Sequence, residues 1–439
     1  MSDCPYALPV DIDRSFRGQL LISAHIKTVA FSFLDCRNQA HNTAVENKLN
    51  ILFILNSMYW GGIGRIMSDV SCRLPENVHQ TFVLLENKIA YPHRGRLFIL
   101  QRSQSKHLPG RALQLLRTVM KFRRIIKEVK PDIVMSFHHD ARIVNLLAKA
   151  SLPTVRYKTI MADLGLASHY RKFLNGARKH IYRLFVSLTI KQAHRMIAIA
   201  EGVKADIIAG FGVDQRKIDV IYGSVDPEQA RQMALESIEH PWFSDTVPLI
   251  ALSGRLVFEK NQADLLKAFA LVRKTIFCRL VLIGDGLERN SLTRLAQDLG
   301  VAADVLFTGF QSNPHKYVAR SSVFAFPSLF EAQGLVMVEA MAVGCPVVAY
   351  DCPVGPREML APGTSKPDGK WEIEEARYGI LVPPENVEAL AKAILKLLND
   401  SQLRERYSRI GKERATHFNA DGMAQKYLNT IMTVVRELA

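Results

Sequence analysis

Two glutamates separated by seven residues, Glu331 and Glu339, follow a short apolar segment that ends at Pro327. The pattern predicts a strand up to Pro327, a loop that contains Glu331, and a helix that begins near Gly334 and carries Glu339. A loop carboxylate accepts hydrogen bonds from sugar hydroxyls, and an acidic residue in a nucleotide site accepts both hydroxyls of a ribose. The spacing therefore indicates a site that holds a sugar at Glu331 and a ribose at Glu339.

The helix expected after Gly334 also offers a phosphate site. Its first amides, those of Gly334, Leu335 and Val336, have no acceptor within the helix and can donate to a phosphate. Glu339 has a simpler interpretation as a solvated helix residue. Its neighbours in the sequence are apolar: Val336, Met337, Val338, Ala340 and Met341. A buried carboxylate is costly unless it has a partner, which favours the binding role.

A second pair of charged residues, Arg255 and Lys260, follows the strand predicted over residues 249–253. A helix is expected from about Asn261, so both cations lie on one loop before a helix. Arginine supplies a fixed fork of donors and lysine a mobile point charge, and together they suit a diphosphate. They could also be ordinary surface residues. Their place at the carboxyl end of a strand favours ligand binding.

Two further loops of the first half could face a ligand. Gly62 belongs to a glycine-rich turn after the first predicted strand, where a backbone approach to phosphate and a simple tight turn are equally good interpretations. His138 and His139 end another predicted strand and could contact a sugar or move a proton, although a structural role is at least as good for each. No spaced His, Asp or Glu cluster is present, so no metal site is expected.

Short β-rich runs alternate with helical patterns over residues 50–222 and again over residues 249–382. Such alternation predicts an α/β chain with two doubly wound, Rossmann-like domains that face each other across a cleft. We divide the chain into an N-terminal extension of unknown role (1–48), an N-terminal Rossmann-like domain (49–225), a linker (226–248), a C-terminal Rossmann-like domain (249–415) and a C-terminal helical segment (416–439). For that last segment, packing back on the N-terminal domain is one option.

The positive charge is concentrated in one region. The 439 residues carry a net charge of +15, and residues 94–195 hold 22 Lys and Arg against four acids, a net +18 that leaves −3 for the rest. A mean hydropathy of +0.02 and 23% charged residues exclude a disordered chain. A solvated helix face, nucleic acid and an anionic membrane would each explain the excess. No nucleic-acid-binding motif is recognised, so a membrane or phospholipid-linked substrate is preferred.

Several motifs together resemble glycosyltransferase family 4. They are Ser253–Lys260, the pair Glu331 and Glu339, Cys352–Glu358, Ile199–Val203 and His240–Phe243. The resemblance covers about residues 49–435 and is stronger over the second domain than over the first. It implies the GT-B fold and the transfer of a sugar from a nucleotide diphosphate donor with retention of anomeric configuration, without a required metal or other cofactor.

The resemblance also implies a role for each candidate residue. Glu331 would hold the transferred sugar and Glu339 the donor ribose. Arg255 and Lys260 would bind the diphosphate as it leaves, and Gly62 would approach the donor phosphates. Those roles agree with the chemistry inferred above from residue type and position.

This chain departs from the family pattern at three places. Ala332–Gly334 replaces the Gly-Phe-Gly-like stretch between the glutamates, and Gly223–Asp226 replaces the usual Asn-Pro or Asn-Gly before Val-Asp. The first-domain loop that often presents a histidine reads Thr159–Asp163 and has none.

We expect a retaining glycosyltransferase that moves a hexose or N-acetylhexosamine from a UDP-linked sugar to a lipid-linked saccharide, glycolipid or polysaccharide. It would work in the cytoplasm, peripherally on the inner face of the membrane, with no nucleic-acid partner. The alternatives are an epimerase or phosphorylase of the same fold and a non-catalytic subunit in polysaccharide assembly.

Overall fold

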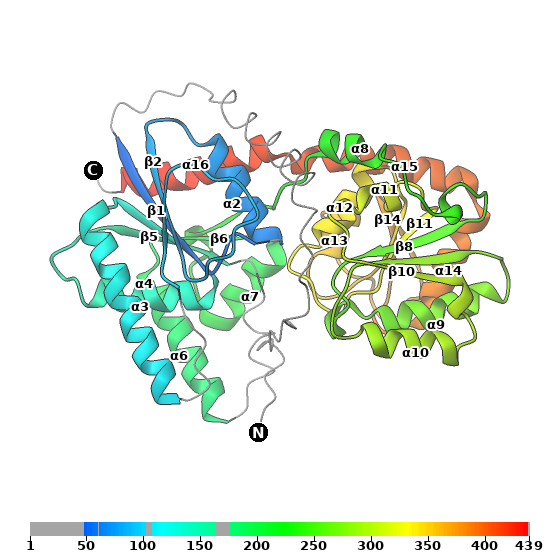
Figure 1. Cartoon of the computed structure of the whole chain (residues 1–439), viewed down its shortest axis with the longest axis horizontal. Coiled ribbons are helices and arrows are strands. Elements are labelled where there is room, and N and C mark those ends of the chain that lie inside the picture. Colours follow the sequence, from blue (N-terminus) through cyan, green and yellow to red (C-terminus); the bar gives the residue numbers. More distant parts are fainter. Residues whose placement is uncertain (1–47, 60, 102–107, 164, 166–175, 438–439) are drawn as a thin grey trace, which may run out of the picture.

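The computed structural model describes residues 48–59, 61–101, 108–163, 165 and 176–437. Two separate seven-stranded sheets form two domains, side by side in Figure 1. The first sheet has the order β3-β2-β1-β4-β5-β6-β7, and its strands are all parallel. Its strands are β1 (Leu49–Leu55), β2 (Val78–Leu84), β3 (Arg96–Ile99), β4 (Ile133–Phe137), β5 (Lys158–Asp163), β6 (Arg195–Ala198) and β7 (Ile218–Val220).

Helices cover both faces of this first sheet (Figure 1). They are α2 (Gly62–Arg73), α3 (Leu108–Val129), α4 (His138–Ala150), α6 (Ala177–Gln192) and α7 (Glu201–Phe211). Strand β1 is an almost continuous apolar run, and Ile51–Leu55 is fully buried. Strands of this kind can only be accommodated where helices pack on both sides of a parallel sheet.

The second sheet repeats the plan, with the order β10-β9-β8-β11-β12-β14-β13. Only β13 runs antiparallel, at the edge. The strands are β8 (Leu249–Ser253), β9 (Arg279–Ile283), β10 (Val305–Gly309), β11 (Val323–Phe326), β12 (Val347–Tyr350), β13 (Glu374–Ala376) and β14 (Gly379–Val382). The helices are α8 (Pro227–Ala234), α9 (Gln262–Arg273), α10 (Arg289–Asp298), α11 (His315–Val318), α12 (Leu335–Ala342), α13 (Pro356–Leu360), α14 (Val387–Asn399), α15 (Ser401–Ala415) and α16 (Ala420–Arg436). Both sheets are doubly wound, as the alternation predicts.

The last helix returns to the first domain. Helix α16 packs against α2, and Met423, Tyr427, Ile431 and Val434 are buried in the core of the first sheet. The red helix of Figure 1 therefore spans the two domains. The two domains are thus joined twice, by the chain after β7 and by the chain before α16.

The structure contains elements that the sequence did not indicate. Residues 226–248, expected as a linker, include α8, which packs on α11 and α12 of the second domain. Asp226 begins this helix, because its side chain accepts the Gln229 amide and Pro227 fits the first helical position. The short run of residues 159–163, considered as a loop, is part of the interior strand β5, which pairs with β4 and β6.

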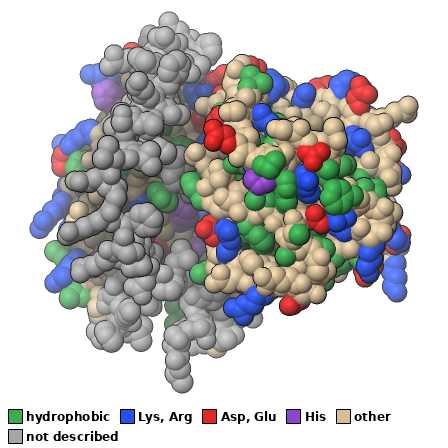
Figure 2. Space-filling model, turned by 45° about the vertical axis from the view of Figure 1, so that its right-hand side comes forward, with side chains coloured by type: hydrophobic (Ala, Val, Ile, Leu, Met, Phe, Trp, Pro, Cys, Tyr) green, Lys and Arg blue, Asp and Glu red, His purple; other side chains and the backbone are tan. Residues whose placement is uncertain are grey.

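Charges of both signs are interspersed on the face of the second domain seen in Figure 2. The positive excess counted over residues 94–195 belongs to the first domain, because all of these residues precede the second sheet. Within the described part of the chain, none of the helices combines the length and apolarity needed to cross a membrane.

Candidate active site

The Lys260 ammonium donates a hydrogen bond to Oε1 of Glu331, joining two loops that are far apart in the sequence. Lys260 ends the turn after β8, and Glu331 lies in the loop after β11. Because β8 and β11 are parallel neighbours, their carboxyl ends meet at one edge of the sheet. The Leu329 amide also donates to the Glu259 carbonyl at 2.9 Å, which fixes one loop to the other.

This ion pair is largely removed from solvent. The side chains of Lys260 and Glu331 are 20% and 10% exposed, and the ammonium lies 5.4 Å from the centre of the Phe326 ring. Gly355 packs against the same loop, since a Cβ there would come within 2.7 Å of the Gln333 carbonyl. The Pro-Gly turn after β12 therefore forms a wall beside Glu331.

Arg255 lies on the same loop as Lys260 but is exposed. Its carbonyl accepts a hydrogen bond from Gln262 Nε2 at 2.9 Å, which ties the loop to the start of α9. No partner is recorded for its guanidinium among the described residues. The side chain is therefore available for a ligand at this edge of the sheet.

The glycine turn after β9 packs closely against the loop after β8 that carries Arg255 and Lys260. Gly284 has φ +141°, and a Cβ there would lie 2.0 Å from the Gly254 carbonyl oxygen. A Cβ on Gly286 would lie 2.3 Å from the Leu256 carbonyl oxygen. These glycines are required by the neighbouring backbone, so their presence needs no ligand to explain it.

Helix α12 begins at the loop that carries Glu331. Gly334 precedes it with φ +81°, a left-handed conformation that favours glycine. The first amides of α12, including those of Leu335 and Val336, lack acceptors in their own helix and are directed to the same edge of the sheet. The loop, the helix start and the Lys260 turn thus converge, as the sequence predicts.

Glu339 contacts the other domain. Arg65 of α2 donates to Glu339 Oε1 at 3.2 Å, and the two side chains are 23% and 20% exposed. His315 is buried nearby, and burial lowers its pKa, with Glu339 and Arg65 acting on it in opposite directions. Burial raises the pKa of Tyr91, which also interacts with Arg65 and Glu339. Arg65, Tyr91 and His315 are thus candidate site residues beside Glu339 that the sequence analysis missed.

The turn with Gly62 is not packed against other described residues. A Cβ on Gly61 or Gly62 would meet no atom of the described residues within 4 Å, whereas one on Gly64 would lie 2.6 Å from the Tyr59 carbonyl oxygen. Packing therefore explains glycine at Gly64 but not at Gly62. Gly61 has φ +147°, which itself favours glycine. Arg65 lies one helical turn after this open backbone.

The two histidines differ in their surroundings. His138 opens α4 with φ +62°, a left-handed conformation that is uncommon outside glycine. His139 Nε2 lies 2.9 Å from the Tyr182 hydroxyl of α6, and the two rings meet edge to face. The structure thus places His139 at the boundary between α4 and α6.

Three further contacts hold the domains together beside the site. Gln333 bonds both polar groups of the Gly223 backbone, its Oε1 accepting from the amide at 2.8 Å. Ser224 donates to the half-buried Asp69 at 2.8 Å, and partial burial raises the pKa of that carboxyl. The Glu358 carboxylate accepts from three donors of the first domain, at the start of α7 and just after β7: the amides of Glu201 at 2.9 Å and Gly202 at 2.8 Å, and the hydroxyl of Tyr222 at 2.7 Å.

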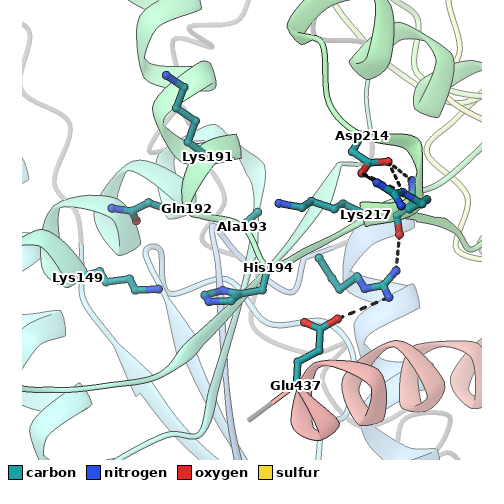
Figure 3. A pocket seen from close by; sticks show the side chains of 10 residues that line it. Lys149, Lys191, Gln192, Ala193, His194, Asp214, Lys217 and Glu437 are labelled. Atoms are coloured by element: carbon teal, nitrogen blue, oxygen red, sulfur yellow. Dashed lines mark hydrogen bonds and ion pairs between the residues drawn. The ribbon is translucent and has the colours of Figure 1, made fainter.

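A separate basic cavity lies at the amino edge of the first sheet, away from these residues (Figure 3). Its volume is about 570 Å³. Residues from the ends of α4 and α6 and from the start of β6 and β7 line it, including Lys149, His194 and Lys217. Amino-edge cavities are not where open α/β sheets bind their ligands. Within the described ranges, no group of three or more His, Cys, Asp or Glu is arranged to hold a metal ion.

Two family models match adjacent parts of the chain. "Glycosyltransferase Family 4" matches residues 60–229, and "Glycosyl transferases group 1" matches residues 236–414. Together they cover both domains described above.

Characterised relatives match over most of their length. An N-acetylgalactosamine-N,N'-diacetylbacillosaminyl-diphospho-undecaprenol 4-alpha-N-acetylgalactosaminyltransferase of Campylobacter jejuni is 25% identical over 378 residues, which are 85% of this chain and 96% of that protein. A lipopolysaccharide 1,6-galactosyltransferase of Salmonella typhimurium is 28% identical over 257 residues, which are 57% of this chain and 65% of that protein.

Solved structures share the architecture. The apo form of the lipopolysaccharide outer core galactosyltransferase WaaB has a TM-score of 0.64 at 21% identity, covering 88% of this chain and 99% of its own. Anabaena Alr3699/HepE in complex with UDP and glucose has a TM-score of 0.66 at 20% identity, covering 88% and 100%. The chain belongs to glycosyltransferase family 4 and has the GT-B fold.

Proposed function

We propose that the chain is a retaining glycosyltransferase that moves a hexose or N-acetylhexosamine from a UDP-linked donor to a lipid-linked saccharide, glycolipid or polysaccharide. The observation that carries this proposal is the Lys260–Glu331 pair beside the start of α12. A cation, a carboxylate and free helix amides at one edge match the diphosphate and sugar of a nucleotide-sugar.

The chemistry follows from these positions. Glu331 accepts hydrogen bonds from hydroxyls of the transferred sugar and fixes its orientation. Arg255 and Lys260, with the amides of Leu335 and Val336, neutralise the diphosphate as negative charge develops on it. Such preorganised charge and positioning supply most of the catalysis, and no covalent nucleophile takes part.

The transfer needs one bond broken, one bond formed and one proton moved, and none of these steps requires a metal or another cofactor. The bond between the sugar anomeric carbon and the leaving phosphate oxygen breaks, and the acceptor hydroxyl oxygen bonds to the same face of that carbon. The acceptor proton passes to an oxygen of the departing phosphate. Attack on the face from which the phosphate leaves retains the anomeric configuration.

The choice of donor and acceptor draws on the relatives. HepE is described in complex with UDP-glucose, and the Campylobacter relative acts on a diphospho-undecaprenol-linked saccharide. The basic first domain would hold the protein at the inner face of the cytoplasmic membrane, where such an acceptor is presented.

A panel of UDP-, GDP- and ADP-sugars tests the donor through protection against thermal unfolding. A UDP-sugar should protect most, and product analysis by NMR should show the donor's anomeric configuration. Protection by no nucleotide-sugar would favour a non-catalytic subunit, and inverted product would contradict the mechanism. Nucleotide release that needs no added acceptor would favour an epimerase.

A further inference from the structure

Two helices of the first domain, α3 and α6, each carry an exposed apolar stripe that begins in the N-terminal half of the helix. Three large apolar side chains are exposed on each helix: Leu113 49%, Leu116 56% and Met120 48% on α3, and Ile181 53%, Leu184 58% and Leu188 40% on α6. Each set follows the spacing i, i+3, i+7, which puts its members on one side of a helix. These six are nearly half of the thirteen large apolar side chains that are exposed in the described residues. Isolated exposed leucines need no explanation, but two aligned stripes do.

Both stripes begin on the helix ends that extend beyond the cleft edge of the first sheet, with Leu113 and Leu116 on α3 and Ile181 and Leu184 on α6. Helix α3 has 22 residues, about 33 Å, whereas the strand β4 that follows it spans about 17 Å. Its buried side chains begin at Thr118, and those of α6 begin at Val186. Each helix runs antiparallel to the strand that follows it. The N-terminal ends of α3 and α6 therefore lie at the carboxyl edge of the sheet, where the turn with Gly62 also lies. Figure 1 shows α3 and α6 projecting together beyond the sheet, and both pack on α4.

Basic side chains lie beside both stripes. They are exposed at Arg117, Lys121, Arg124 and Lys127 on α3, and at Arg183 and Lys191 on α6. None of the six has an ion pair recorded within the described part of the chain. Glu128 is the one acid in the sequence of α3 and pairs with Arg96, and the sequence of α6 contains none. The stripes therefore lie in a positive field with little local compensation.

We propose that this α3–α6 face docks on an anionic phospholipid membrane. The apolar side chains enter the boundary between headgroups and acyl chains, and the basic side chains bind the lipid phosphates, as in interfacial amphipathic helices. A second copy of the chain would bring the same positive charge to the contact and be repelled. Nucleic acid would account for the cations but leaves the apolar stripes unexplained. Docking by this face turns the cleft edge of the first domain toward the lipid.

This inference rests on the proposed function in one respect, because a lipid-linked acceptor gives the cleft a reason to face a membrane. Its geometry is independent of Glu331 and Lys260. Docking and transfer can therefore fail separately.

Co-sedimentation of the full chain with vesicles tests the apolar part. Vesicles of phosphatidylcholine alone are compared with vesicles that also contain phosphatidylglycerol. On the anionic vesicles, Leu116→Gln and Leu184→Gln should each lower the partition coefficient by about tenfold. Leu235→Gln, which alters an even more exposed leucine of the second domain (75% exposed), should leave the partition coefficient unchanged.

A charge variant tests the basic part. Arg117→Gln, Arg124→Gln and Lys127→Gln together should lower partitioning on the order of 100-fold. The matched triple variant Lys274→Gln, Arg294→Gln and Arg409→Gln removes three exposed charges from the second domain and should have little effect. Wild-type binding should weaken steeply with added salt.

Three results would overturn the proposal: equal binding to neutral and anionic vesicles, normal binding by both leucine variants, or loss of self-association in Leu116→Gln during sedimentation velocity. The last would assign the face to a contact between copies. UDP binding by the docking variants should match wild type, which shows that they fold. Glu331→Gln should bind vesicles normally, so a failure of the proposed transfer reaction would leave docking intact.

Discussion

The guanidinium of Arg65 lies 3.2 Å from the carboxylate of Glu339, so a helix of the first domain already contacts the second-domain residue assigned to the donor ribose. Both side chains are about four-fifths removed from solvent. The ribose hydroxyls would need the same carboxylate, and Arg65 now contacts its Oε1. Donor binding and this contact between the domains are therefore coupled through one side chain.

We predict that Arg65→Gln tightens UDP binding by about threefold, since an ion pair of this exposure is worth about 1 kcal/mol at most. Isothermal titration calorimetry measures the change. Arg73→Gln on the same helix is the control, because Arg73 pairs with Asp69 and Asp421 instead. Weaker binding by Arg65→Gln would mean that Arg65 contacts the donor directly.

Arg255 and Lys260 should differ in their effect on stability. Arg255→Gln should weaken UDP binding by about tenfold or more without changing the melting temperature, because its exposed guanidinium has no recorded partner among the described residues. Lys260→Gln should weaken binding and also cost about 1–3 kcal/mol of stability, because it leaves the Glu331 carboxylate without its partner. Calorimetry and thermal unfolding together separate the two cases, and equal losses of stability would contradict the assignment.

Glu358 should hold the two domains close. Glu358→Ala removes the acceptor of two α7 amides and of the Tyr222 hydroxyl, a loss of about 1–3 kcal/mol. Small-angle scattering should show a larger radius of gyration, and hydrogen exchange at Glu201 and Gly202 should accelerate. Glu405→Ala, an exposed carboxylate of α15, should change neither. An unchanged exchange rate at Gly202 would show that the contact is not maintained in solution.

His194 should make the first domain sensitive to acid. Burial, together with Lys149 and Lys158, lowers the pKa of His194 to about 4. The folded state thus binds fewer protons than the unfolded state between pH 6.5 and about 4, so stability falls as the pH falls through that window. Denaturant unfolding at a series of pH values measures this slope. His194→Asn keeps an acceptor for the Thr159 amide and should flatten it, whereas a steeper slope would contradict the account.

The sequence predicts most of the second-domain site because the strands that precede its residues can be recognised, and their order in the sheet brings those residues together. Arg255, Lys260 and Glu331 each follow a buried strand, and parallel neighbours place their carboxyl ends together. Helix α12 was predictable for the same reason. The short edge strands β3 and β13 were not, because none of the residues of β3 and only Ala376 of β13 are buried.

The contacts between the two domains could not be predicted from strand and helix patterns in the sequence. Arg65 and Glu339 are 274 positions apart in the sequence. Their pairing depends on how the two separate sheets are placed relative to each other. The role of Gln333 is of the same kind, since it bonds Gly223, 110 positions away. Periodicity and spacing describe a single domain and carry no information about that placement.

The proposed function depends most on Glu331 as the residue that binds the hydroxyls of the transferred sugar. Steady-state transfer by Glu331→Gln, measured beside its affinity for UDP, tests this most directly, with Glu405→Gln as the control. We predict that kcat falls on the order of 100-fold or more while the Kd for UDP, which carries no sugar to grip, stays within about threefold of wild type. Near-normal turnover by a folded Glu331→Gln enzyme would contradict it.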